Sequence, residues 1–342
     1  MALRASSHSS SPTSASLPAL VAAFAAVYLI WGSTYLGIKY AIESIPPLLM
    51  AGVRFSIAGM MVIAWMRRRH GLAWPTALQW RNAAIVGGLL LLTGNGLICI
   101  AQQRLPSGLT ALLVATVPLW MTLLEWLVFR SARPTLRTFI GLALGLLGVL
   151  ALIDPRNLLG EPIHLASAGL VLIACLSWSI GSLYSRRAEL PQSLMLASGM
   201  EMLCAGVGLI IAGSLRGEWS SVDLAAIQWR SIAAFAYLLV FGSLIGFSAY
   251  IWLLRRVSPA AVSTYAYVNP MVAVLLGWWL AHEAVGLRTW VAAGLIIAAV
   301  VMITLRRNTP AAAPNLPKAP REQASPSNVA PPAAGRLCAL ED

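Results

Sequence analysis

Long apolar stretches recur along almost the whole chain and are separated by short segments that carry most of its charge. A transmembrane helix needs about 20 consecutive, mostly apolar residues to cross the hydrocarbon core of a bilayer. Ten stretches satisfy this requirement: 18–40, 47–66, 82–102, 107–129, 136–153, 164–185, 192–214, 231–254, 259–280 and 286–305. We therefore predict an all-α polytopic membrane protein with ten transmembrane helices.

Composition agrees with this fold class. Of the 342 residues, 58% are hydrophobic and 11% are charged, whereas a soluble domain carries about 25% charged residues. This difference excludes an ordinary soluble enzyme, a disulfide-rich secreted domain and a disordered protein. Residues 1–16 are Ser-rich, and residues 308–342 are rich in Pro and Ala. Neither segment can bury enough apolar area to fold, so we predict a disordered tail at each end.

The positions of the positive charges predict the orientation of the helices. The formal net charge is +12. With residue 1 in the cytoplasm, 17 of the 24 basic residues lie on the cytoplasmic side, 6 lie on the opposite side, and Arg54 lies within a span. Because cytoplasmic loops are enriched in Lys and Arg, we predict that both termini are cytoplasmic. We expect a multi-pass protein of the cytoplasmic (inner) membrane, with the lipid bilayer around it.

Other partners are not indicated by the charge or by the cysteines. No basic stripe with interleaved aromatic residues occurs, so we expect no nucleic-acid partner. The cysteines Cys99, Cys175, Cys204 and Cys338 have no metal-ligand spacing, and we expect neither a metal ion nor a cofactor.

The two halves of the chain resemble each other. Four matched features keep the same order at offsets of 147 to 152 residues, which is the signature of an internal repeat. They are Trp31 with Trp178, Gln79–Arg81 with Gln228–Arg230, Pro118 with Pro270, and Arg137–Thr138 with Arg288–Thr289. We place the repeats at 17–154 and 163–307. Each holds five spans, an odd number, so the second repeat inserts upside down relative to the first. Secondary transporters have this inverted architecture, with the substrate near the midplane between the repeats.

Two ionisable residues lie at matching depths in the two repeats. Arg54 is in the second span and Glu201 is in the seventh, at an offset of 147 residues. A charge at the bilayer centre costs about 2.5–3.5 kcal/mol on insertion scales. We hypothesise that both face a central cavity, where they pair in one state or contact a charged or zwitterionic substrate. The alternatives are a static buried ion pair, or side chains that reach the nearer interface. Glu201 is also the candidate for a proton-coupling carboxylate.

Aromatic and amide side chains inside the spans form a second set of substrate-binding candidates. An indole can offer its face to an aromatic or cationic ligand, although core packing is the alternative for such residues. A buried amide needs partners from another helix or from the substrate. The candidates are Trp31, Tyr35, Asn95, Trp178, Tyr250, Tyr265 and Asn269.

Pro118 and Pro270 are each expected about halfway along a helix. A proline in a helix interior removes a backbone hydrogen bond and kinks the helix. Two interpretations stay open: a gating kink, or a plain structural kink.

Several motifs resemble a known family. The first half contains Trp31–Tyr35 with Lys39, Gly52–Phe55, Pro106–Gly108 and Thr116–Pro118; the second contains Ser177–Trp178, Val257–Pro259, Tyr265–Pro270 and His282–Glu283. Together they resemble the ten-helix drug/metabolite exporters of the EamA type over about residues 18–307. The resemblance implies a carrier that exports small metabolites or drugs by alternating access. The family's acidic residue after the ninth helix matches Glu283, but the equivalent loop of the first half, 130–134, has no acid.

We therefore predict a secondary transporter for a small-molecule substrate. No P-loop pattern indicates ATP binding by this chain. A channel or facilitator for a small solute is the alternative, and an intramembrane enzyme is a further one. An enzyme would need a cluster of reactive groups within the spans, but the aspartates outside the C-terminal tail, Asp154 and Asp223, lie in loops.

Overall fold

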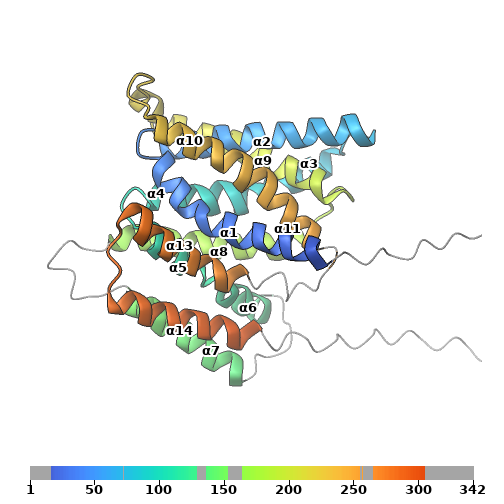
Figure 1. Cartoon of the computed structure of the whole chain (residues 1–342). Helices are drawn as coiled ribbons and strands as arrows, with labels where there is room; N and C mark the ends of the chain where they lie inside the picture. Colours follow the sequence, from blue (N-terminus) through green and yellow to red (C-terminus); the bar gives the residue numbers. More distant parts are fainter. Residues whose placement is uncertain are drawn as a thin grey trace, which may run out of the picture. The chain divides into compact units, whose positions relative to one another are not determined.

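The computed structural model describes residues 17–71, 73–128, 136–152, 164–254, 256 and 265–304, and the secondary structure of this part of the chain is helical (Figure 1). The helices are α1 (Leu17–Ala41), α2 (Pro47–His70), α3 (Ala77–Gly87), η1 (Gly88–Asn95), α4 (Gly96–Ala101), α5 (Ser107–Val114), α6 (Val117–Leu127), α7 (Leu136–Leu152), α8 (Leu165–Ser185), α9 (Leu194–Leu215), η3 (Glu218–Ser221), α10 (Trp229–Tyr237), η4 (Leu238–Gly246), α11 (Phe247–Leu254), α13 (Tyr265–Ala281) and α14 (Leu287–Thr304). The predicted tails, 1–16 and 308–342, lie outside the described residues.

The apolar helices agree with the predicted class of membrane protein. Seven helical stretches are long and apolar enough to cross a bilayer: Leu17–Ala41, Pro47–His70, Ala77–Ala101, Ser107–Leu127, Leu165–Ser185, Leu194–Leu215 and Trp229–Tyr250. The other three predicted spans contain shorter apolar helices, at Leu136–Gly148, Val268–Ala281 and Leu287–Ala299. The chain is therefore a helical protein of the membrane.

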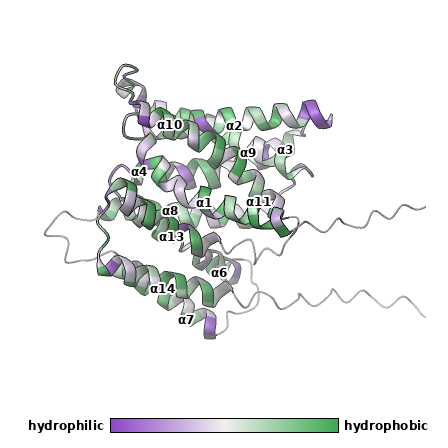
Figure 2. Cartoon of the chain, viewed as in Figure 1, coloured by the Kyte–Doolittle hydropathy of each residue, from purple (hydrophilic) through white to green (hydrophobic). Residues whose placement is uncertain are grey.

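Apolar side chains also cover the outer faces of these helices. On α7, for example, Leu146, Leu147 and Leu150 are each more than half exposed. Figure 2 shows apolar residues along the lengths of the helices, and the hydrophilic residues are most concentrated at the end of α2. An outer surface of this kind suits a lipid solvent, because contact between leucine side chains and water is unfavourable.

Two of the spans contain a π-helical segment in their middle. η1 lies between α3 and α4, and η4 lies between α10 and α11. The sequence predicts an uninterrupted helix for each of these spans, so the two segments are a departure from the prediction. A π-helical segment has wider turns than an α-helix and is frequently found at functional sites.

The span that contains Pro118 differs from its prediction. The helix is interrupted at Ala115 and Thr116, and α6 begins at Val117. Pro118 is therefore in the first turn of α6, where its missing N–H costs nothing, rather than in the middle of a helix. The cause lies in proline itself, because its nitrogen has no hydrogen to donate to the carbonyl oxygen of Val114 and its ring crowds that oxygen. Pro270, in contrast, lies inside α13 as predicted.

The halves approach each other closely where α2 crosses α9. A Cβ atom on Gly59 would lie 2.6 Å from the backbone nitrogen of Leu203, and one on Gly52 would lie 2.9 Å from that of Ile210. From the side of α9, a Cβ on Gly199 would lie 3.0 Å from Val62. The residue numbers at these contacts increase along α2, from 52 to 59, while they decrease along α9, from 210 to 203. The two helices are therefore antiparallel. Small residues at such a crossing let the backbones pack directly against each other.

The remaining helices also pack mostly across the two halves. α1 packs against α13 and against the segment formed by α10, η4 and α11. α8 packs against η1, α4, α5 and α6, while α7 packs against α14. Figure 1 shows α7 beside α14 at the bottom of the view. The halves therefore share an extensive interface rather than forming two separate bundles.

Candidate functional site

Three of the predicted aromatic residues form one group between α1, α11 and α13. The ring centroid of Trp31 lies 5.0 Å from that of Tyr250 and 5.3 Å from that of Tyr265. The centroids of Tyr250 and Tyr265 are 6.1 Å apart. The ring of Tyr265 is nearly perpendicular to both others, at 88° and 82°, which is a favourable edge-to-face arrangement. All three side chains are partly exposed.

Trp31 and Trp178 each lie against a glycine of a π-helical segment in the opposite half. A Cβ atom on Gly246, in η4, would lie 2.8 Å from Nε1 of Trp31. A Cβ atom on Gly94, in η1, would lie 3.3 Å from Cε3 of Trp178. The glycines are thus the residues that leave room for the indole rings. The structure does not bring Trp178 into the aromatic group of Trp31.

Arg54 is a buried cation with an amide partner. Its side chain is 4% exposed, and its Nη2 donates a hydrogen bond to Oδ1 of Asn95 at 3.0 Å. The guanidinium carbon lies 4.2 Å from the ring centroid of Phe55. The buried Nε atom has no hydrogen-bond partner in the described part of the chain. Arg54 and Asn95, two predicted site residues, are therefore in direct contact, and Arg54 keeps an unused donor.

Glu201 is buried separately on α9. It is 8% exposed, and α3 approaches it so closely that a Cβ atom on Gly87 would clash with its backbone carbonyl. The ion pairs within the described residues are Lys39–Glu283, Arg186–Glu125 and Arg230–Glu43. Arg54 and Glu201 are therefore not paired with each other in this structure.

Asn269 and Tyr35 each take part in hydrogen bonds between a side chain and a backbone carbonyl oxygen. Asn269 is 6% exposed, and its amide nitrogen can donate to the carbonyl oxygens of Tyr28 and Tyr265, each at 3.2 Å. The bond to Tyr28 joins α13 to α1. The carbonyl oxygen of Tyr35 accepts a hydrogen bond from Nε2 of Gln102 at 3.1 Å.

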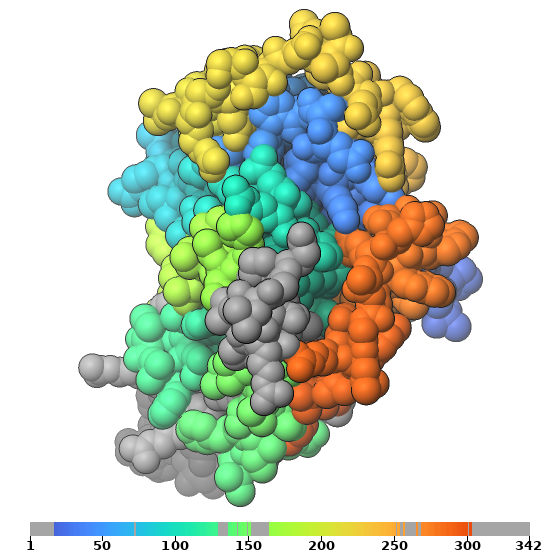
Figure 3. All heavy atoms as spheres, turned by 90° about the vertical axis from the view of Figure 1, so that its left-hand side faces the viewer, coloured from blue at the N-terminus to red at the C-terminus, as the bar shows by residue number. Residues whose placement is uncertain are grey.

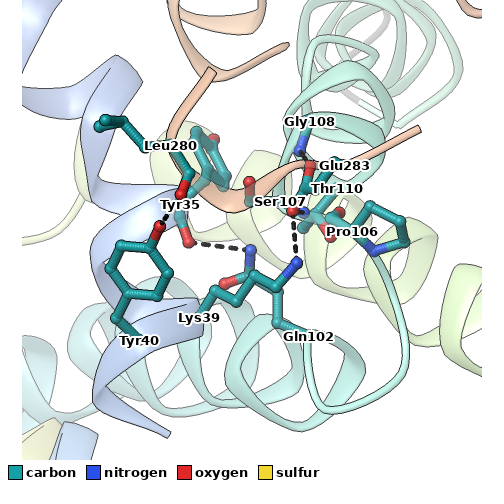
Figure 4. Close-up of polar contacts among 10 residues, drawn as sticks. All are labelled: Tyr35, Lys39, Tyr40, Gln102, Pro106, Ser107, Gly108, Thr110, Leu280 and Glu283. Atoms are coloured by element: carbon teal, nitrogen blue, oxygen red, sulfur yellow. Dashed lines mark hydrogen bonds and ion pairs between the residues drawn. The ribbon is translucent and has the colours of Figure 1, made fainter. Parts of the chain in front are cut away.

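Glu283 forms the most extensive polar contact between the halves. The carboxylate accepts hydrogen bonds from Nζ of Lys39 at 2.7 Å and from the backbone nitrogens of Ser107 at 2.7 Å and Gly108 at 3.1 Å (Figure 4). Its side chain is 5% exposed. The backbone donors belong to the first turn of α5, where the helix dipole favours a negative charge. We call Lys39, Ser107, Gly108 and Glu283 the Glu283 cluster.

The backbone around Glu283 is shaped to bring the carboxylate to this position. His282 has a positive φ of 52°, an uncommon conformation for a residue other than glycine. The backbone nitrogen of Glu283 donates to the carbonyl oxygen of Gly277 at 3.0 Å. A Cβ atom on Gly277 would clash with the Glu283 carboxylate. Glycine is therefore required at position 277, because a larger residue would displace the carboxylate.

Further contacts between the halves lie at the same end of the helices. The Tyr40 hydroxyl donates to the carbonyl oxygen of Leu280 at 2.9 Å (Figure 4). Oε2 of Glu218 accepts hydrogen bonds from the backbone nitrogens of Leu48 and Leu49, each at 3.0 Å, at the start of α2. Figure 3, which views this end, shows segments of the first half in blue and teal in contact with α13 in orange. The halves are thus joined here.

Burial raises the pKa of Glu283, but the hydrogen bonds from Lys39, Ser107 and Gly108 and the charge of Lys39 outweigh this effect, so the pKa is lowered. A lowered pKa stabilises the fold above the pKa of the unfolded carboxyl, about 4.3, and this contribution disappears as the pH falls through the folded value. We expect Glu283→Gln to lower the thermal midpoint at pH 7 and to lower it less below about pH 4. Unfolding curves of both proteins at pH 7, 5 and 3.5 test this; an equal difference at every pH would contradict it.

The Glu283 cluster is only partly visible in the sequence. The family resemblance singles out Lys39 and Glu283 separately, and nothing connects them with each other or with Ser107. Lys39 and Glu283 are 244 residues apart, and the turn at His282 has no local signature. The sequence does not single out buried Gln102, and it includes buried Ser107 only within the Pro106–Gly108 motif; each leaves one side-chain oxygen without a hydrogen-bond partner among the described residues.

The geometry defines a helical membrane protein in which two halves share polar and aromatic contacts between their spans. The chain belongs to the EamA-like transporter family, which it matches over residues 17–153 and again over 165–305.

Several relatives of this chain carry the names of transporters. The inner membrane transporter YedA of Escherichia coli is 44% identical over 288 residues, which cover 84% of this chain and 90% of YedA. The transporter YvbV of Bacillus subtilis is 27% identical over 305 residues, covering 86% and 94%. A "Probable amino-acid metabolite efflux pump" of Salmonella typhimurium is 27% identical over 284 residues, covering 79% and 91%. The predicted family and the class of multi-pass inner membrane transporter are confirmed.

Proposed function

We propose that this protein is a secondary transporter that exports a small metabolite or drug by alternating access between two inverted repeats of five helices each. The observation that carries the proposal is the Glu283 cluster. It joins the halves at one end of the spans through a carboxylate from one half and three donors from the other.

The packing of the halves supports an inverted repeat. Gly52 and Gly59 of α2 are each 147 residues before Gly199 and Gly206 of α9, and these four residues form the antiparallel crossing. Antiparallel packing of corresponding helices is what an inverted repeat requires. The π-helical segments η1 and η4 also begin 150 residues apart. The separate family matches of the two halves add to this support.

The contacts at the Glu283 end support a state of the carrier that is closed at this end. With both termini in the cytoplasm, this end faces away from the cytoplasm, because α1 ends here after one crossing. In alternating access, the contacts of the Glu283 cluster must then break so that the substrate can leave the protein at this end. Reporter fusions after residues 75, 157 and 307 test the orientation. Extracytoplasmic reporter activity after residue 75 or 307 would contradict it.

The substrate site is proposed between the midplane residues of both repeats. Arg54 offers a buried positive charge, with Asn95 holding its guanidinium, and an anionic group of the substrate would neutralise this charge. An apolar or cationic part of the substrate could pack against the aromatic faces of Trp31, Tyr250 and Tyr265. Such a pair of surfaces suits a zwitterionic metabolite, in line with the name of the Salmonella relative.

Glu201 is proposed as the proton-coupling carboxylate, since it is buried and carries no ion pair within the described residues. We expect Glu201→Gln to abolish transport driven by a pH gradient and to leave the protein folded, because the amide has the same shape but cannot release a proton. Uptake into proteoliposomes with and without a pH gradient measures this. Thermal unfolding of the variant is the control for folding. Unchanged gradient-driven transport would remove Glu201 from the mechanism.

The experiment that tests the function is a counterflow screen. Proteoliposomes are loaded with unlabelled amino acids, sugars or cationic drugs, and the entry of the same labelled compound is followed at two pH gradients. A carrier is expected to give exchange that saturates with substrate concentration. Flux that does not saturate would favour the channel or facilitator instead.

A further inference from the structure

A second region of chemical interest lies at the C-terminal end of α2, at the opposite end of this helix from Leu48 and Leu49, which bind Glu218. It is a cavity of about 750 Å³ between the end of α2, the start of α3 and α9. The residues that define its chemistry are Met60, Ile63, Arg67, Arg68, Trp74 and Trp80. Figure 2 shows that the hydrophilic residues of α2 gather at this end. The proposed transport function does not use any of these side chains.

The lining of the cavity changes from apolar to cationic along α2. Met60 and Ile63 come first, and Leu203 of α9 faces the same space. Arg67 and Arg68 follow, beginning about 10 Å beyond Met60 along the helix, given a rise of 1.5 Å per residue. Met60 is 52% exposed, so this apolar wall is open to the surroundings of the helices. In a bilayer, these surroundings are lipid acyl chains.

We expect the two arginines to lie at the level of the lipid headgroups. The guanidinium carbon of Arg67 lies 3.5 Å from the ring centroid of Trp74, which is 66% exposed. Tryptophan is enriched at the interface between hydrocarbon and water. Neither Arg67 nor Arg68 takes part in an ion pair within the described residues. The residues that line the cavity include no acid, so both charges can bind an external anion.

We propose that this cavity binds an anionic glycerophospholipid, with its phosphate between Arg67 and Arg68 and an acyl chain along Met60, Ile63 and Leu203. Basic pockets between transmembrane helices bind lipid headgroups in this way. Charge complementarity selects an anionic headgroup, and the apolar wall selects a lipid over free phosphate. Because the cavity contacts both α2 and α9, the lipid bridges helices from the two halves.

Native mass spectrometry of the full-length protein tests the proposal, with phosphatidylglycerol and phosphatidylcholine as probes. We expect wild-type protein to retain phosphatidylglycerol in preference to phosphatidylcholine. The double variant Arg67→Gln/Arg68→Gln is expected to lose about 30-fold in phosphatidylglycerol binding, since each basic residue near the surface contributes on the order of 1 kcal/mol and about 1.4 kcal/mol corresponds to a factor of ten. Arg69→Gln is the matched control, because Arg69 is the next residue but does not line the cavity.

Two further arms of the experiment separate lipid binding from misfolding and from binding of free phosphate. Arg67→Lys/Arg68→Lys is expected to keep most of the binding, which distinguishes charge from loss of folding. Inorganic phosphate is expected to leave the bound lipid in place. Equal retention of both lipids, the same loss in Arg69→Gln, or displacement by phosphate would overturn the proposal. So would a double glutamine variant that binds phosphatidylglycerol as the wild type does.

Discussion

Replacement of Arg54 by leucine is expected to reduce substrate exchange by about 30-fold or more. Removing one partner of a buried, hydrogen-bonded charge pair costs about 2–5 kcal/mol, and about 1.4 kcal/mol corresponds to a factor of ten. In the proposed function, the other partner of Arg54 is the anionic group of the substrate. The measurement is counterflow in proteoliposomes with a compound that the wild-type protein exchanges. Arg54→Lys keeps the charge and is expected to retain part of the exchange.

The stability of the Arg54 variant separates a functional role from a structural one. Arg54 is 4% exposed and has no carboxylate partner in the described part of the chain. An unpaired buried charge destabilises the fold, so the thermal midpoint of Arg54→Leu should be unchanged or raised. Arg216→Leu, which removes an exposed cation outside the spans, is the matched control. If Arg54→Leu exchanges substrate as fast as the wild-type protein does, Arg54 is not part of the substrate site.

Replacement of Glu283 by glutamine is expected to shift the protein toward a form that is open at the Glu283 end. The amide keeps the size of the side chain but loses the charge, and its NH2 group cannot accept a hydrogen bond, so the three donors no longer all find an acceptor. Charged hydrogen bonds stabilise proteins by about 1.5–3 kcal/mol and neutral ones by about 0.5–1.5 kcal/mol. A net loss of about 1–2 kcal/mol changes the ratio of open to closed forms by roughly tenfold.

The opening is measured by alkylation of a cysteine at Thr110, in a chain that lacks its four native cysteines. Thr110 is fully buried in α5, close along the helix to the Glu283 carboxylate. We expect a water-soluble maleimide to label Thr110→Cys about tenfold faster in the Glu283→Gln background. Glu43→Gln is the control, because it breaks a more exposed ion pair, to Arg230, at the same end. Equal labelling rates in all three proteins would contradict the proposed role of Glu283.

The helices are largely predictable from the sequence because length and hydropathy are local properties. The predicted spans 18–40 and 47–66, for example, correspond to Leu17–Ala41 and Pro47–His70. The π-helical segments are not predictable in this way, since Gly88–Asn95 reads as an ordinary apolar run. A kink is predicted at Pro118, but the helix is interrupted just before it, because proline cannot donate the backbone hydrogen bond to the residue four positions earlier.

The candidate site is predictable as a set of residues rather than as a geometry. Trp31, Tyr250 and Tyr265 come together because α1, α11 and α13 are neighbours, which only the fold determines. Arg54 stands out for its charge within a span, but its partner in the structure is Asn95. The contact of Glu283 with Lys39 depends on the positions of two distant segments, so no local pattern predicts it.

The distance between the two halves at the Glu283 end tests alternating access most directly. Spin labels at Gln103 and Ala284, both exposed residues outside the helices and from opposite halves, report this distance by double electron–electron resonance in lipid nanodiscs. We predict a short and a long distance, with the long one more populated in Glu283→Gln and when a transported substrate is added. A single distance that neither the variant nor the substrate changes, in a protein that still exchanges substrate, would contradict the proposed mechanism.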